Sequence, residues 1–166
     1  MKISKVYSAI PYGYTGHLVT VEGDATRGLP AFNIVGMPGK MITESRDRIR
    51  SALRNSLFDF PRHKIIINLA PAELRKDSTH LDLPITLAIL SLSQQLLAKD
   101  LQNRMFVGEL SLDGNLKPIK GILNIVETAK KYRFKQLIIP AGNMPQATLL
   151  ADNNLDIIPA HNLREL

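Results

Sequence analysis

The sequence predicts a single α/β domain (α+β) with a mixed sheet, and three observations lead to this prediction. Short runs in which apolar residues alternate with polar ones open the chain, which is typical of strands. Two later segments, 41–57 and 83–97, have the length and apolar content of helices. Further strand and helix patterns then alternate to residue 166 without a repeat, a low-complexity tract or a linker rich in Ser or Gly.

The first third of the chain is expected to form three strands of an antiparallel sheet. Turn residues in 11–16 and 23–28 separate the three runs. The expected strands are 2–10, 17–22 and 31–35. Pro38 and Gly39 then end the strand pattern, and Ile42, Ile49 and Leu53 recur at helical spacing. We therefore predict an amphipathic helix over 41–57.

A strand and a buried helix are expected in the middle of the chain. Residues 63–69 form a largely β-branched run, which predicts a strand covered on both faces. Residues 83–97 have the composition of a buried helix. The polar, basic loop that joins them is the place where we expect a functional site, with Asp82 as a candidate cap of the helix.

The last third is expected to begin with a hairpin. Asp113 and Gly114 lie between the runs 105–110 and 115–119, and this dipeptide is a strong signal for a two-residue turn. The remaining expected elements are a helix from residue 121, a strand at 136–139, a short helix at 144–150, a strand at 156–158 and the start of a helix at 162–166.

Composition restricts the classes of function. The chain has 21 Lys and Arg against 15 Asp and Glu, a net charge of +6, which favours an acidic partner such as nucleic acid or an acidic protein surface. The absence of Trp argues against a platform that stacks bases, so contacts to DNA are expected to be with phosphate. There is no cysteine, and four scattered histidines match no common zinc pattern, so no metal is expected.

Apolar runs and the first residues predict the compartment. The longest apolar runs are far shorter than the roughly 20 residues of a membrane span. The first residues lack the charged, apolar and small-residue zones of a signal peptide. We therefore expect a cytoplasmic protein without a membrane partner.

Basic side chains recur along the predicted helix 41–57 and around the strand after it. Three arginines are spaced by four residues on the helix, which would allow contact with several phosphates. The candidate residues for nucleic-acid or partner binding are Arg46, Arg48, Arg50, Arg54, Arg62, Lys64, Arg75 and Lys76. The alternatives are contact with a protein or a second subunit, and a solvated helix face with the pairs Glu44–Arg48 and Asp47–Arg50.

Two other candidate sites have weak patterns. Segment 36–41 has glycines and a lysine before a helix, but Ile34 and Met41 occupy positions where a P-loop requires Gly and Ser or Thr, so we expect no ATP site in this chain. Glu109 ends a predicted strand and is a candidate acid, yet the sequence places no second carboxylate or histidine near it.

Four segments carry a resemblance to a known family. They are 28–39 (GLPAFNIVGMPG), 44–50 (ESRDRIR), 68–90 (NLAPAELRKDSTHLDLPITLAIL) and 108–121 (GELSLDGNLKPIKG). In this order they resemble the N-terminal domain of the Mg-chelatase-like AAA+ ATPases of the ComM/YifB type, from about Ser4 to the last residue. The resemblance implies a Lon-protease-like fold over 1–166, shared with a ribosomal-protein domain and the GHMP kinases, with one left-handed strand-helix-strand crossover.

The resemblance also implies partners and cofactors. An AAA+ ATPase motor involved in DNA processing during natural transformation is expected downstream of this chain, and ATP and Mg would bind there and not here. The expected partners are this motor, further copies in a ring-shaped homo-oligomer, and DNA.

The resemblance to Lon-like proteases raises the question of catalysis. Such a protease has a serine in a Lys-Asp-Gly-Pro-Ser-Ala-Gly loop and a lysine on a later helix. This chain keeps Lys76-Asp77, but Asp82 or His80 aligns with the serine, and Leu123 aligns with the lysine and cannot accept a proton. The resemblance therefore implies a non-catalytic accessory domain for oligomerisation, partner binding or DNA binding.

One alternative keeps an enzyme. A cryptic serine peptidase would need a displaced dyad of Ser78, or its neighbour Thr79, with Lys120, which lies one helical turn before Leu123. The interpretation without a catalytic role is that Ser78 and Thr79 are solvated loop residues.

Overall fold

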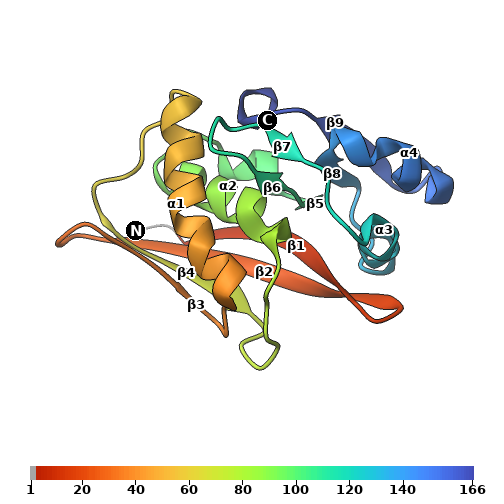
Figure 1. Ribbon diagram of the computed structural model, residues 1–166, viewed down its shortest axis with the longest axis horizontal. Coiled ribbons are helices and arrows are strands. Elements are labelled where there is room, and N and C mark those ends of the chain that lie inside the picture. The colour runs from red at the N-terminus through yellow and green to blue at the C-terminus, as the bar shows by residue number, and fades with distance from the viewer. Residues whose placement is uncertain (1–2) are drawn as a thin grey trace.

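The computed structural model describes residues 3–166, so the expected start of the first strand at Lys2 lies outside the described residues. A seven-stranded mixed sheet has the order β3-β4-β2-β1-β5-β8-β9 (Figure 1). Its strands are β1 (Ser4–Tyr12), β2 (Thr15–Thr26), β3 (Ala31–Val35), β4 (Lys64–Ala70), β5 (Arg104–Phe106), β8 (Gln136–Pro140) and β9 (Asp156–Ala160). The prediction of a single α/β domain with a mixed sheet is confirmed.

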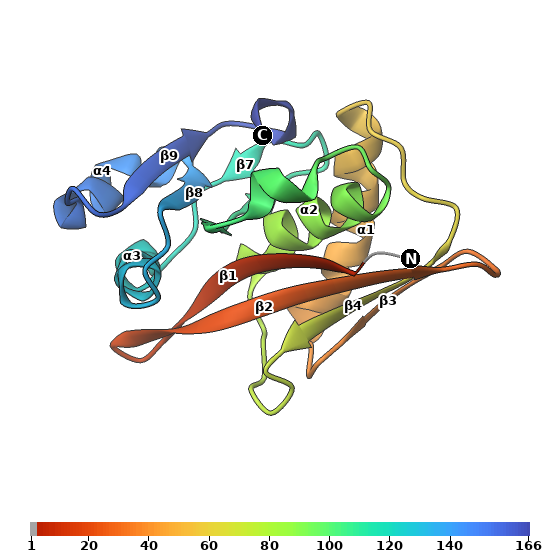
Figure 2. The ribbon, with the colours of Figure 1, turned by 180° about the vertical axis from the view of Figure 1, so that it is seen from behind.

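Helices cover both faces of this sheet. They are α1 (Lys40–Asn55), α2 (Asp82–Leu92), α3 (Ile122–Lys131) and the short α4 (Met144–Ala147). Helix α2 packs on the face of β1 that carries Val6 and Ile10, with α1 beside it, whereas α3 packs on the opposite face around Ala9 (Figure 2). The core is therefore divided in two by the sheet. None of the described helices is both long and apolar enough to cross a membrane.

Strand β3 does not continue the antiparallel hairpin of β1 and β2, so the prediction of three consecutive antiparallel strands is wrong. It pairs in parallel with β4, and β4 lies between β3 and β2. Helix α1 connects these two parallel strands, because it carries the chain from the end of β3 back to the edge of the sheet where β3 began and where β4 also begins. Residues 27–30, between β2 and β3, therefore carry the chain past one strand position.

The second face of β4 is open, contrary to the expectation of a strand covered on both faces. Ile65, Ile67 and Leu69 are buried under the helices, whereas Ile66 and Asn68 on the other face are only partly buried. The reason is that α3 covers this second face only at the far end of β1 and β2. The β-branched residues of β4 therefore indicate that this segment forms a strand, but they do not indicate that both of its faces are buried.

The region 104–117 also differs from its prediction. The expected strand 105–110 divides into β5, which joins the large sheet, and β6 (Glu109–Leu110), which pairs with β7 (Leu116–Lys117). Five residues connect Leu110 to its partner Leu116, so the two-residue turn is wrong, although Gly114 does have a positive φ of 86°. Helix α2 is buried as predicted but ends at Leu92, since Gln94 adopts a positive φ of 60°.

Candidate functional site

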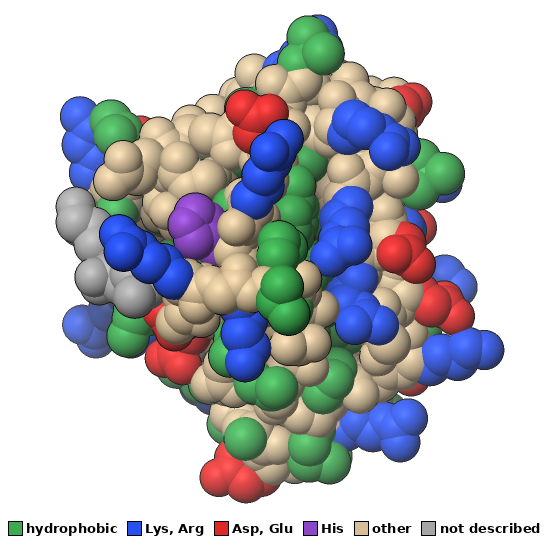
Figure 3. Space-filling model, turned by 90° about the vertical axis from the view of Figure 1, so that its left-hand side faces the viewer, with side chains coloured by type: hydrophobic (Ala, Val, Ile, Leu, Met, Phe, Trp, Pro, Cys, Tyr) green, Lys and Arg blue, Asp and Glu red, His purple; other side chains and the backbone are tan. Residues whose placement is uncertain are grey.

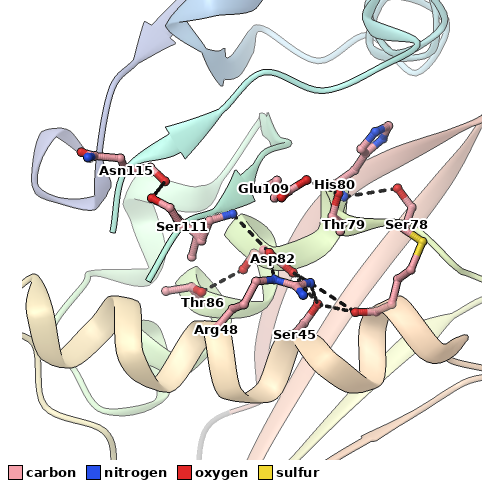
Figure 4. Close-up of polar contacts among 12 residues, drawn as sticks. Ser45, Arg48, Ser78, Thr79, His80, Asp82, Thr86, Glu109, Ser111 and Asn115 are labelled. Carbon is pink, nitrogen blue, oxygen red and sulfur yellow. Dashed lines mark hydrogen bonds and ion pairs between the residues drawn. The ribbon is translucent and has the colours of Figure 1, made fainter. Parts of the chain in front are cut away.

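A cluster of three polar residues lies where the N-terminus of α2 meets α1. We define the Asp82 cluster as Ser45, Arg48 and Asp82. Arg48 Nε donates to Oδ2 of Asp82 at 3.0 Å, its Nη2 donates to Oδ1 at 3.2 Å, and Ser45 Oγ donates to Oδ1 as well (Figure 4). The amide of Leu110 donates to Oδ2 at 3.1 Å. Asp82 is completely buried, and both its carboxylate oxygens accept hydrogen bonds.

Local sequence explains how the cluster forms. Ser45 and Arg48 are three residues apart on α1 and so share one helix face, which packs against α2. Burial raises the pKa of Asp82, while the hydrogen bonds from Arg48 and Ser45 act in the opposite direction. Asp82 is the first residue of α2, after Leu81 in the cap position, and it makes long-range bonds in place of the expected cap. Both carboxylate oxygens of Asp82 are therefore held by hydrogen bonds from within the protein.

The Lys76-Asp77 pair of the Lon-like loop is also used for structure. Lys76 is completely buried, and its Nζ donates to the carbonyls of Gly36 and Leu69 at 2.8 Å each and to that of Pro71. Burial lowers the pKa of Lys76, with the charge of Glu73 opposing. Lys76 thus joins the end of β4 to the turn that follows β3, and its ammonium is not available at the surface for a phosphate.

Asp77 holds the beginning of α1. Its Oδ1 accepts from the amide of Met41 at 2.9 Å, and its Oδ2 lies 4.0 Å from Nη2 of Arg75. A Cβ on Gly39, the cap residue of α1, would lie 2.2 Å from Cγ of Asp77, so glycine is required for this close approach. A carboxylate 36 residues away in sequence therefore caps α1.

A cavity of about 430 Å³, which we call the α3 cavity, opens where the end of β1 meets the start of α3. Its lining consists of Ile10, Pro11, Tyr12, Arg75, Asp77, Ser78, His80, Lys120 and Gly121. The structure therefore brings Ser78 and Lys120, the two residues of the displaced dyad, to one cavity. No hydrogen bond joins them among the described residues; Ser78 Oγ instead accepts from the amide of His80 at 3.2 Å.

His80 is a buried histidine at this cavity. It is 7% exposed, its Nδ1 has no hydrogen-bond partner, and burial lowers its pKa to about 4, with the charge of Glu109 opposing. Its ring points away from the Asp82 cluster in Figure 4. Glu109 itself accepts from Thr79 Oγ1 at 2.7 Å, so the candidate acid ties the loop to β6.

The basic candidates on α1 separate into an inner and an outer group. Arg48 points inward to Asp82, and the expected pair with Glu44 is not formed. We call Arg46, Arg50 and Arg54 the α1 arginine row. Arg46 donates to the carbonyl of Phe32 at 3.4 Å, and the guanidinium of the exposed Arg50 lies 5.1 Å from the centre of the Phe60 ring.

The remaining basic candidates lie in two other places. Arg62 lines a cavity of about 730 Å³ together with Arg27 and His63, and Lys64 is exposed at the start of β4. Arg75 is exposed at the α3 cavity. Figure 3 shows Lys and Arg side chains gathered on the side of this face where α1 lies, with further ones spread across it. The basic candidates therefore form no single patch. Arg27 is a further basic residue at the cavity of Arg62, and no pattern in the sequence indicated it.

Metal-ligating side chains do not gather in the part of the chain that the structure describes: no group of three or more His, Cys, Asp or Glu is placed to hold an ion there. Leu123, at the aligned position of the Lon lysine, is 38% exposed on α3.

Comparison with known proteins gives a family match and two kinds of relatives. Residues 21–143 match the family described as subunit ChlI of Mg-chelatase. The chain is 41% identical over 154 residues to competence protein ComM of Haemophilus influenzae, which covers 93% of this chain and 30% of that protein. It is 39% identical over 150 residues to the uncharacterized protein YifB of Escherichia coli, covering 90% of this chain and 29% of that protein.

A more distant relative is a protease. The chain is 27% identical over 150 residues to the archaeal Lon protease of Methanocaldococcus jannaschii, covering 90% of this chain and 22% of that protein. This chain thus spans 30% of the length of ComM and less of the Lon protease.

Proposed function

This chain belongs to the Mg-chelatase-like family as a ComM/YifB-type N-terminal domain, and on that premise we propose that it is a non-catalytic accessory domain of an AAA+ ATPase, which binds DNA or a protein partner. The observation that supports the proposal is the set of contacts made by Asp82 and Lys76, the residues that resemble positions of the protease loop. Asp82 is saturated by Arg48, Ser45 and the amide of Leu110, and Lys76 is buried among three carbonyls. Charged groups fixed in this way stabilise one conformation of the loop, and a carboxylate or ammonium held by such bonds is a poor nucleophile or base.

The exposed arginines support the binding part of the proposal. Arg50 and Arg54 project from α1 into solvent, and the chain has an excess of six positive charges. Phosphate contacts from such side chains are independent of base sequence and sensitive to salt. One relative is named a competence protein, and this name supports our proposal that the domain acts in DNA processing during natural transformation. The expected setting is a ring-shaped oligomer of the longer protein in the cytoplasm, with ATP and Mg bound to its motor.

DNA binding is tested by fluorescence anisotropy. Labelled single-stranded, duplex and forked DNA are titrated with this chain at two salt concentrations, with the variant Arg50→Glu/Arg54→Glu beside it. The matched control is Lys131→Glu/Lys135→Glu, which changes the charge by the same amount at exposed positions at and just beyond the end of α3.

We expect affinity that falls steeply with salt and is lost in the arginine variant alone, because each phosphate contact contributes a slope of about −0.9 in log K against log salt. Absence of binding at low salt, or equal loss in both variants, would assign the α1 arginine row to a protein interface.

A second function has one observation in its favour, which is the shared position of Ser78 and Lys120 at the α3 cavity. A cryptic serine peptidase would degrade fluorescently labelled unfolded casein, and both Ser78→Ala and Lys120→Ala would abolish the activity. We favour the binding domain because Ser78 Oγ contacts the backbone of His80 and is not bonded to Lys120 among the described residues. Turnover that vanishes in both alanine variants would overturn this preference.

A further inference from the structure

The α3 cavity lies at the N-terminus of a helix whose first amides are free. Helix α3 has ten residues, its cap residue Gly121 has no side chain, and no acidic residue lies in its first turn. Among the described residues, the backbone amides of Ile122 and Leu123 donate to no acceptor. Free amides and the helix dipole together favour a negative group at this end of the helix.

Gly121 holds this helix end against β1. Its φ is 74°, and a Cβ at this position would lie 2.4 Å from Cγ of Pro11. Both residues line the α3 cavity, so its apolar wall of Ile10 and Pro11 directly adjoins the amide-bearing end of α3.

His80 is a second group at this cavity without a partner. Its ring is 7% exposed and lines the cavity, and its Nδ1 is enclosed without a hydrogen-bond partner. A neutral imidazole carries one N–H, so this ring can donate one hydrogen bond to a ligand.

Two cationic side chains and one carboxylate also line the cavity. Lys120 and Arg75 are exposed side chains at the cavity. Asp77 is also there, but its Oδ1 is bonded to the amide of Met41 and its Oδ2 lies 4.0 Å from Arg75. The cavity therefore offers an imidazole and two cations to one negative group, beside an apolar wall and next to the free amides at the start of α3.

We propose that the α3 cavity binds the carboxylate at the C-terminus of a peptide or protein partner, with the last, apolar side chain of that partner against Ile10 and Pro11. Capture of a terminal carboxylate by free backbone amides is an established mode of peptide recognition. A single negative charge suits the site better than a phosphate, because Asp77 repels a dianion and because a phosphate brings nothing to the apolar wall. This site is separate from the α1 arginine row, so it stands whether or not that row binds DNA.

The test is NMR titration of the isotopically labelled chain with three probes. These are the peptide acetyl-Ala-Ala-Leu with a free carboxylate, the same peptide as its C-terminal amide, and inorganic phosphate. We expect the acid to shift the amide signals of Ile122 and Leu123 and the ring signals of His80 in a saturable way, and the amidated peptide to shift none of them.

Variants sharpen this test. Lys120→Ala removes a cation from the cavity and should weaken binding of the acid by about fivefold. Lys117→Ala, which removes another exposed lysine that does not line the cavity, should leave the affinity unchanged. The proposal is overturned if acid and amide act alike, if the acid causes no shift at about 10 mM, or if phosphate shifts the same signals at lower concentration than the peptide.

Discussion

Arg48 on α1 and Asp82 on α2 form two hydrogen bonds, of 3.0 Å from Nε and 3.2 Å from Nη2, although they lie 34 residues apart in the sequence. Their helices touch at this point, and β6 adds the amide of Leu110. The pair therefore fixes three elements relative to one another.

Replacing Asp82 should destabilise the domain severely. Asp82→Ala leaves the guanidinium of Arg48 and the amide of Leu110 without their partner, and loss of one member of a buried pair costs about 3–5 kcal/mol. Urea unfolding followed by circular dichroism measures this loss. The double variant Arg48→Met/Asp82→Ala should be less unstable than the sum of its single variants, since the stranded cation is gone; additive losses would contradict the coupling.

Replacing Lys76 should also destabilise, through its three carbonyl partners. Lys76→Met fills the space but leaves buried acceptors unsatisfied, for which we expect a loss of about 2–4 kcal/mol in the free energy of unfolding. Arg75→Ala, one residue earlier and exposed, is the matched control and should change stability by less than about 0.5 kcal/mol. Equal stability of Lys76→Met and the wild type would show that the clamp on Gly36, Leu69 and Pro71 is unimportant.

His80 should make stability depend on pH. Its folded pKa of about 4 lies below the ordinary histidine value of 6.5, so the unfolded chain takes up a proton first as the pH falls. The contribution is nearly complete above pH 7 and decreases as the pH falls toward 4, by roughly 2.5 kcal/mol at pH 4.5.

The measurement for His80 is urea unfolding at pH 7 and pH 4.5. His80→Gln should lose less stability between these two pH values than the wild type does, whereas His63→Gln, at an exposed position, should follow the wild type. An unchanged pH dependence in His80→Gln would refute the contribution of this ring.

Asp77 should act as a helix cap from a distance. Asp77→Ala removes the acceptor for the amide of Met41 and should cost about 1 kcal/mol, as loss of a capping side chain does. Asp77→Asn retains an acceptor oxygen and should recover most of the loss. Hydrogen exchange at the first turn of α1 should increase in the alanine variant, and unchanged exchange would show that water satisfies this amide equally well.

The sequence predicts the elements of this fold better than their partners. Helix α1 follows from Ile42, Ile49 and Leu53 because helix periodicity is a local property. The parallel position of β3 and the separation of β5 from β6 depend on contacts distant in sequence, which no local pattern records. Turn chemistry likewise predicted the glycine conformation at Gly114 but not the length of its loop.

The candidate site shows the same division. Basic side chains are visible in the sequence, but whether one faces water or a carboxylate depends on the fold, so Arg48 and Lys76 are internal while Arg50 and Arg75 are exposed. One signal was available: Asp82 is the only charged residue in the apolar segment 81–90, and a carboxylate in such a setting requires a partner.

The α1 arginine row has a consequence for solubility that is independent of any ligand. Strand β3 is an edge of the sheet, with Asn33 and Val35 exposed, and Arg46 reaches the carbonyl of Phe32 on this strand. Like charges beside an open edge oppose its pairing with the same edge of another copy. Replacing the α1 arginine row with glutamate would keep a repulsion between like charges at this edge, whereas replacing it with alanine would remove the repulsion. Alanine variants of the row should therefore aggregate more readily than glutamate variants.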